Sequence, residues 1–338
     1  MPETQYHGRR ACYIENETLR VTLLVEGGHI AEILHKATGV NPLWTPPWPS
    51  IEPSSYSLAK HPEYGSDSES KLLSGIMGHN LCLDLFGPPS PEEAAAGMTV
   101  HGEASINGYA FENCEGALVQ TTRSEAAGLA FVRRLRMDGA GIHIQESVEN
   151  ATTLDRPIAW TEHVTLGPPF LEKGSTRFRA TATKSRTLEG LDFDWPRLPK
   201  ADGSREDLQV FTDAPSSGGF TTHLMDPARD DAWFMAWSPS AKVVLGYVWR
   251  RQDFPWLGIW EENYSRQTPP WNGRTLTRGM EFGASPFPEP RRQMIDRGSL
   301  FSAPGYRWIP ALTTVTVEYT AFLDAADAIP EEPPVTLR

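Results

Sequence analysis

The chain has 338 residues and a formal net charge of −12, with 39% hydrophobic and 22% charged residues. This length is enough to bury a large core, and the composition is typical of a globular protein rather than a disordered one. A nucleic-acid partner would need a basic stripe, and Arg133, Arg134 and Arg136 form only a short cluster. We therefore expect no DNA or RNA partner.

The N-terminal residues contain no apolar stretch of the kind a secretory signal requires. No run approaches the roughly 18 apolar residues of a membrane-spanning helix. Cys12, Cys82 and Cys114 are odd in number, lie far apart and include no CxxC pair, which favours reduced thiols over a disulfide framework. These observations predict a cytoplasmic protein with no membrane partner.

In the first third of the chain, short apolar stretches predict strands over 19–25 and 29–35. The segment 41–70 has too many prolines for either a strand or a helix, and we expect a long ordered loop over a binding cleft. A single short helix is predicted over 91–98, because Pro91 opens it and acidic residues follow in its first turn.

Further strands follow to the end of the chain. In 313–323, Val315, Val317 and Tyr319 alternate with polar residues, the pattern of a half-buried strand. The tail 328–338 should be peripheral. Without βαβ alternation or a linker, the pattern indicates one all-β domain over 1–338, a sandwich or a barrel. The other predicted strands are 129–137, 141–150, 232–237 and 242–249.

Three separated stretches resemble the aldose 1-epimerase (galactose mutarotase-like) superfamily, particularly its glucose-6-phosphate 1-epimerase-like branch. They are GIMGHNLCLDLFGPP (75–89) with TVHGEASINGYAF (99–111), IAWTEHVTLGPPFL (158–171), and FPWLGIWEENYS (254–265) with RGMEFGASPFP (278–288). The resemblance implies a β-supersandwich of two large antiparallel sheets, with a sugar-binding cleft on one of them. It places a sugar-binding histidine on His101, a general acid on His163 and a general base on Glu281.

Such residues suffice for mutarotation, the interconversion of α and β anomers. A base takes the proton from the O1 hydroxyl while an acid protonates the ring oxygen, and no cofactor is needed because only protons move. A carboxylate and a histidine are suited to these roles near neutral pH. We expect His163 and Glu281 to lie far enough apart to admit a pyranose ring between them, in one cleft with His101.

Other residues near these motifs are candidates for binding the substrate: His79, Asp253, Trp260 and Glu261. Asp226 is an alternative to Asp253. Glu261 and its neighbour Glu262 point to opposite faces of a strand, and one of them could line the cleft. At least one tryptophan among Trp256, Trp260 and Trp271 should wall the sugar site.

The branch carries arginines where this chain has Ser74 and Ser105, so we expect a neutral rather than a phosphorylated sugar. A cluster of His79, His101 and His163 would raise the question of a metal, but no compact ligand motif supports one.

Two other functions stay open: a carbohydrate-binding or sensing protein without catalysis, and a glycoside hydrolase or lyase using Glu261 with Glu281. The expected partner is a small carbohydrate, bound by a monomer or homodimer.

Overall fold

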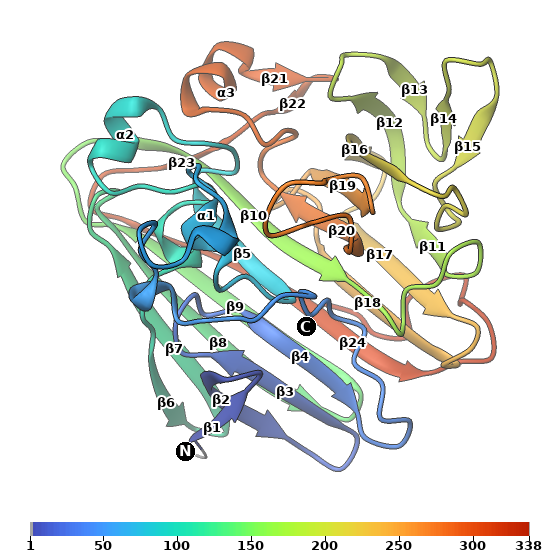
Figure 1. Cartoon of the computed structure of the whole chain (residues 1–338), viewed down its shortest axis with the longest axis horizontal. Coiled ribbons are helices and arrows are strands. Elements are labelled where there is room, and N and C mark those ends of the chain that lie inside the picture. Colours follow the sequence, from blue (N-terminus) through green and yellow to red (C-terminus); the bar gives the residue numbers. More distant parts are fainter. Residues whose placement is uncertain (1–2, 338) are drawn as a thin grey trace.

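Two large antiparallel β-sheets pack face to face in the computed structural model, which describes residues 3–337 (Figure 1). The larger sheet has the order β1 (Glu3–Tyr6), β2 (Arg9–Glu15), β3 (Leu19–Leu24), β4 (Ile30–His35), β5 (His79–Asp84), β10 (Arg156–Leu166), β20 (Leu276–Gly283), β19 (Trp256–Asn263), β16 (Ser217–Met225), β12 (Ala182–Thr187) and β13 (Asp192–Asp194), with β23 (Arg307–Ile309) also paired to β10.

The smaller sheet covers one face of the larger one. Its order is β11 (Arg177–Ala180), β17 (Asp231–Ser238), β18 (Val243–Arg250), β24 (Thr314–Ala325), β9 (Gly141–Asn150), β8 (Leu129–Asp138), β7 (Ala117–Ser124) and β6 (Ala110–Cys114). Two small hairpins complete the strands: β14 (Arg197–Pro199) with β15 (Arg205–Asp207), and β21 (Ser299–Leu300) with β22 (Ala303–Pro304). The predicted all-β sandwich is confirmed, and each of the seven predicted strands is present.

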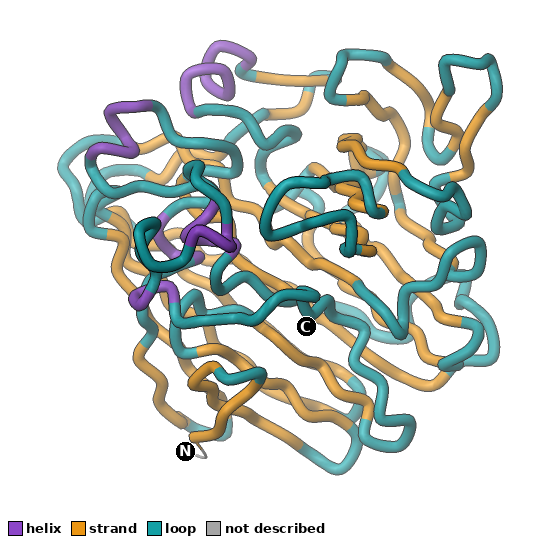
Figure 2. The backbone as a smooth tube through the Cα atoms, in the orientation of Figure 1, coloured by secondary structure: helices purple, strands orange, loops and turns teal. Residues whose placement is uncertain are grey.

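Helices are few and short, and they lie between the top and the left middle of the view in Figure 2. α2 (Pro91–Ala95) begins at the predicted proline, where Ser90 and Glu93 form a capping box, but it ends three residues early. Two further helices were not predicted, because each is too short to show helical periodicity. They are α1 (Ser70–Leu73) and α3 (Arg291–Arg297); the 3-10 turns are η1 (Pro53–Ser55), η2 (Pro62–Tyr64) and η3 (Glu103–Ser105). Across residues 3–337 no helix is long and apolar enough to cross a membrane.

The main core lies between the two sheets. Trp160 and Met280 of the larger sheet, and Phe131 and Tyr247 of the smaller one, belong to one buried cluster. Because side chains alternate along a strand, the residues between these core positions of the larger sheet point to its outer face. That outer face is partly covered by loops, and it carries a cleft.

As predicted, the segment 41–70 is an ordered loop; it packs on this outer face and contains two 3-10 turns that were not predicted. Its side chains Trp44, Trp48 and Tyr64 form a second apolar cluster with Trp271 from the loop after β19. The C-terminal tail lies on the surface of the opposite sheet. There Ile329, Val335 and Leu337 pack against Trp233 and Phe322, among others.

Candidate functional site

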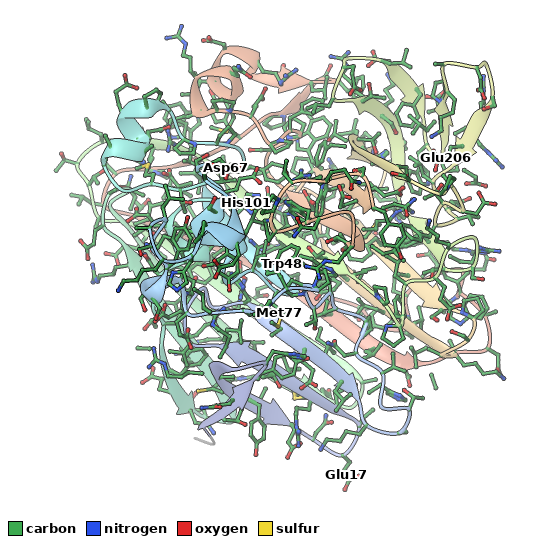
Figure 3. The ribbon with its side chains drawn as sticks, viewed as in Figure 1. Glu17, Trp48, Asp67, Met77, His101 and Glu206 are labelled. Carbon is green, nitrogen blue, oxygen red and sulfur yellow. The ribbon has the colours of Figure 1, made fainter. Side chains whose placement is uncertain are left out.

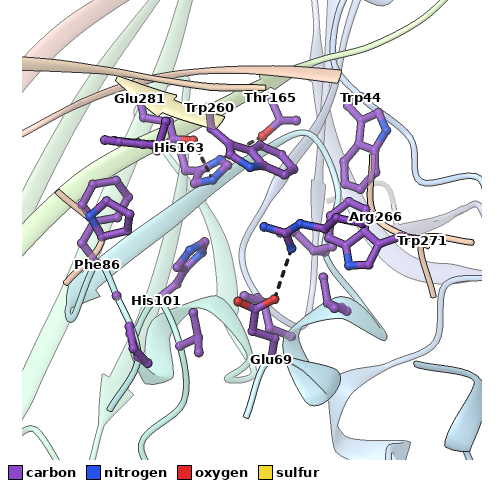
Figure 4. A pocket seen from close by; sticks show the side chains of 18 residues that line it. Trp44, Glu69, Phe86, His101, His163, Thr165, Trp260, Arg266, Trp271 and Glu281 are labelled. Carbon is purple, nitrogen blue, oxygen red and sulfur yellow. Dashed lines mark hydrogen bonds and ion pairs between the residues drawn. The ribbon is translucent and has the colours of Figure 1, made fainter. Parts of the chain in front are cut away.

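The centre of the site is a cross-strand pair on the outer face of the larger sheet. His163 of β10 is the direct partner of Glu281 on β20. His163 Nε2 lies 3.0 Å from Glu281 Oε1, at ion-pair distance (Figure 4), yet this oxygen makes no hydrogen bond of good geometry within the described chain. Both side chains are at least 93% buried. A buried carboxylate oxygen without a hydrogen bond is costly, and a ligand can satisfy it.

The residues next to this pair fix its orientation. Thr165 lies two residues along β10 on the same face, and its Oγ1 is 2.9 Å from His163 Nδ1. Gly279 lies two residues before Glu281 on β20, and a Cβ there would come within 2.4 Å of Glu281 Oε1. The glycine therefore leaves the space in which the Glu281 carboxylate lies along the strand.

His101 reaches the same site from a tight turn. It has a left-handed backbone with φ 66°, which is uncommon and costly for a residue with a side chain. The next residue, Gly102, has φ 78°, and a Cβ there would come within 1.9 Å of the Leu83 carbonyl oxygen. The His101 ring lies 5.1 Å from that of His163, and its Nδ1 is 3.3 Å from Asn80 Nδ2. Burial and the His163 ring hold the pKa of His101 well below its usual value, so this ring is neutral near pH 7.

A cleft surrounds these groups, with about 780 Å³ of space between its walls, part of it open to solvent. Its lining is mainly apolar and includes the indoles of Trp44, Trp260 and Trp271. Figure 3 shows His101 and Trp48 near the middle of the molecule, far from the peripheral Glu17. The predicted loop over the cleft is present, because Trp44 and Glu69 of 41–70 line it.

An arginine that the sequence analysis missed also lines the cleft. Arg266, in the loop after β19, places its guanidinium carbon 4.7 Å from the ring centre of Trp271 and 5.6 Å from that of Trp260. Its Nη1 lies 3.6 Å from Glu69 across the cleft. The signal that could have found it is its place in a loop bounded by two tryptophans.

The structure brings four of the predicted residues together in the cleft: His101, His163, Glu281 and Trp260. The expectation that a pyranose ring fits between His163 and Glu281 is wrong, because the two are adjacent cross-strand partners. His79 was wrongly assigned to the substrate. It is fully buried between the sheets, 2.8 Å from Glu162 and 3.2 Å from the Tyr247 hydroxyl.

Asp253 and Glu261 also lie outside the cleft. Asp253 forms ion pairs with Arg250 and Arg307, so its carboxylate is already satisfied. Glu261 lies on the opposite face of β19 from Trp260 and binds Arg278 at 2.8 Å. Both are corrections to the predicted substrate contacts.

The neighbouring Glu262 points to the outer face but does not line the cleft; it lies behind Arg266 and holds the loop that carries this arginine. Its carboxylate accepts hydrogen bonds from the backbone N–H groups of Ser265 and Arg266. Asp226, the alternative to Asp253, accepts from the backbone of Ala228 and does not line the cleft. Among the tryptophans, Trp260 and Trp271 line the cleft, while Trp256 is buried and donates to the Pro304 carbonyl.

The two serines that stand where the branch has arginines do not reach the cleft. Ser74 donates to the Lys71 carbonyl and Ser105 to that of Gly102, and both are fully buried. The suggested three-histidine cluster does not form either, because His79 lies on the other face of the sheet. Within residues 3–337, no group of three His, Cys, Asp or Glu side chains is arranged to hold a metal ion.

No protein-family model and no curated protein matches this sequence. Solved structures do match. A candidate aldose 1-epimerase from Klebsiella pneumoniae has a TM-score of 0.68 at 15% identity, over 95% of this chain and 80% of that protein. This protein has the galactose mutarotase-like fold. The galactose mutarotase related enzyme from Lactobacillus acidophilus matches 95% of this chain and 99% of its own, at 13% identity and a TM-score of 0.62.

A galactose mutarotase-like protein from Clostridium acetobutylicum gives the same TM-score of 0.62 at 12% identity, over 96% of this chain and 98% of that one. At these identities the likeness concerns the fold. The glucose-6-phosphate 1-epimerase-like branch stays a prediction. Any activity must be argued from the site itself, because one fold can host many functions.

Proposed function

We propose that this protein is a sugar mutarotase of the aldose 1-epimerase type, with Glu281 as the general base and His163 as the general acid. The observation that supports this most strongly is the His163–Glu281 pair. It holds a buried carboxylate oxygen beside an imidazole in an apolar cleft, and no described residue makes a hydrogen bond of good geometry to that oxygen. Such an oxygen is placed to accept a proton from a ligand hydroxyl.

The close contact of the two groups agrees with this chemistry. In a cyclic aldose, O1 and the ring oxygen O5 are bonded to the same carbon, so they lie side by side. Glu281 can take the proton from O1 while His163 donates to O5, and the free aldehyde then rotates about C1–C2 and closes with the roles reversed. An acid and a base on opposite sides of the ring, as first expected, are not required. Positioned proton transfer of this kind is typically worth about 10² to 10⁴ in rate.

The neutral His101 ring completes the arrangement as a sugar-binding group. If the Asn80 amide donates to His101 Nδ1, the opposite nitrogen carries the proton and can donate to a substrate oxygen. No step of this reaction needs a cofactor or a metal, because only protons move.

The two rival functions fare differently. A hydrolase or lyase using Glu261 with Glu281 is disfavoured, because these carboxylates point to opposite faces of the larger sheet. A carbohydrate-binding protein without catalysis would use the same cleft, and only activity separates it from the enzyme.

Anomer exchange measured by NMR on a panel of aldoses tests the proposal. Wild type should exceed the buffer rate, and Glu281→Gln should lower the enzyme-catalysed rate by at least about 100-fold while binding changes little. Glu318→Gln, on the exposed face of the other sheet, is the matched control and should exchange like wild type. A wild-type protein that binds an aldose but never exceeds the buffer rate would favour the binding protein.

A further inference from the structure

Arg266 has hydrogen-bonding capacity that the described chain does not use. Its guanidinium stacks on Trp271 and Trp260, and its two nearest carboxylates, Glu69 and Glu262, lie at 3.6 and 3.7 Å. These are ion-pair distances but are longer than hydrogen bonds. Across residues 3–337, none of its five N–H donors makes a side-chain hydrogen bond. The guanidinium is therefore held in place by stacking and charge, with its donors available to a ligand.

Glu69 is the complementary group on the other wall of the cleft. It lines the same cleft, its side chain is 40% exposed, and its oxygens have no hydrogen-bond donor among the described residues. Burial raises the pKa of Glu69, and the nearby Arg266 opposes that shift. Arg266 and Glu69 thus place a donor and an acceptor side by side, the pair that two neighbouring hydroxyls of a sugar require.

The charge balance of the cleft selects against an anion. Within residues 3–337, Arg266 is the one Lys or Arg side chain that lines the cleft, beside Glu69 and Glu281. Glu262 lies behind Arg266. Even with His163 protonated as the proposed general acid, these three carboxylates outnumber the two cations, within a chain of net charge −12. A phosphate or carboxylate at Arg266 would meet Glu69 and Glu262 within a few ångströms, where like charges repel strongly.

Trp260 connects this pair to the proposed catalytic groups. Its ring centre lies 5.9 Å from that of His163 and 5.6 Å from the Arg266 guanidinium carbon. Figure 4 shows Glu281 and His163 at one end of the cleft and the Arg266–Glu69 pair at the other. A pyranose lying along the indole would present C1 at one end and its remote hydroxyls at the other.

We propose that Arg266 and Glu69 form a second binding subsite that holds two vicinal hydroxyls of a neutral aldose, remote from the anomeric carbon. This rests on the proposed function for the placement of C1 at His163–Glu281. The subsite makes the protein selective for uncharged aldoses over uronic acids and sugar phosphates.

Isothermal calorimetry tests the subsite independently of turnover. The ligands are D-glucose, D-galactose, their 3-deoxy and 4-deoxy analogues, D-glucuronate and D-glucose 6-phosphate. At least one neutral aldose should bind more tightly than either anion, and loss of the hydroxyl that contacts Arg266 should weaken it by about 10- to 100-fold. Arg266→Gln should weaken the neutral aldose similarly, and kinetically the loss should appear in KM more than in kcat.

Glu69→Gln is the sharper variant. It removes one negative charge but keeps an acceptor oxygen, so it should shift the preference toward glucuronate or the 6-phosphate by about 10-fold or more relative to wild type. Arg274→Gln, on the same loop, and Glu63→Gln, on the same segment as Glu69, are exposed controls outside the cleft. Both should bind like wild type.

Tighter binding of an anion than of every neutral aldose by wild type overturns the subsite. So does unchanged aldose affinity in Arg266→Gln, or the absence of binding by any sugar tested. Arg266-dependent binding of a neutral aldose without anomer exchange would support the subsite while refuting the mutarotase.

Discussion

β10 carries ionisable side chains on both faces, and their surroundings differ. On the inner face, Glu162 Oε2 accepts hydrogen bonds from His79, Arg133 and Tyr319, and its Oε1 accepts from Trp160. On the outer face, the neighbouring residue His163 faces Glu281, whose Oε1 lies at ion-pair distance from it but makes no hydrogen bond of good geometry within residues 3–337. Both carboxylates are almost fully buried, so burial alone does not distinguish them.

Hydrogen-bond satisfaction is what separates the two regions. The inner group joins the sheets: Arg133 and Glu146 belong to the smaller one, and Arg133 Nε lies 2.5 Å from Glu146 Oε1. Every carboxylate oxygen there has a partner, as stability requires of buried charges. The outer pair instead leaves an oxygen for a ligand. We infer that the inner cluster of His79, Arg133, Glu146, Glu162 and Tyr319 serves stability and that the outer pair serves chemistry.

The largest expected effect is on the inner side. Arg133→Met would remove the cation that binds the carboxyl groups of Glu146 and Glu162 in this buried cluster, and removing one partner of a buried ion pair typically costs about 3–5 kcal/mol. Urea denaturation should show this loss. Arg134→Met is the control, because Arg134 follows Arg133 on β8 and its side chain points to the other face of the sheet. This variant should change stability by less than about 1 kcal/mol. Equal losses of stability in both variants would mean that the buried cluster stabilises the fold no more than the outward-pointing Arg134 does.

A pH effect should be next in size. Burial is the main cause that raises the pKa of Glu146 from 4.5 to about 8. Between these values the folded protein holds a proton that the unfolded chain has released, so stability should fall as pH rises through this window and level off above it. Glu146→Gln, which mimics the protonated form, should remove this slope. Its stability relative to wild type should therefore rise between pH 5.5 and 8.5, by about 1 kcal/mol or more. A constant difference would contradict the assignment.

The smallest effect should come from Asn80, which follows His79 on β5 but points to the outer face. Asn80→Ala removes one hydrogen bond to His101, so stability should change by only about 1 kcal/mol. The catalysed rate of anomer exchange should fall more noticeably, by about 10-fold, because His101 loses its orientation. If the variant unfolds instead, Asn80 belongs with the structural group.

The sequence predicted the sandwich and its main strands because alternation and turn residues are local signals. For the site, the three family-like motifs and their order along the chain led to the prediction of His101, His163 and Glu281. The errors have a physical cause. β5 and β10 are buried on both faces, so hydrophobicity does not reveal which face a residue occupies. His79 was therefore predicted as a substrate contact, although its neighbour Asn80 is the residue that lies near the cleft, beside His101.

Other features depend on contacts between distant segments. Asp253 is held by Arg307, 54 residues away in sequence, and Glu261 by Arg278. The place of Arg266 in the cleft depends on Glu69, which reaches it from a loop almost 200 residues earlier. No local pattern in the sequence encodes such pairs.

The central claim is best tested by measuring two properties of two variants, Glu281→Gln and Glu162→Gln. Anomer exchange would be followed by NMR and the free energy of unfolding by urea denaturation. We predict that Glu281→Gln lowers the catalysed rate by at least about 100-fold and does not reduce stability by more than about 1 kcal/mol. Glu162→Gln should reduce stability by about 2 kcal/mol or more while the folded fraction keeps a rate within a few-fold of wild type. The reverse pattern, or equal effects in both variants, would contradict the division of the two faces.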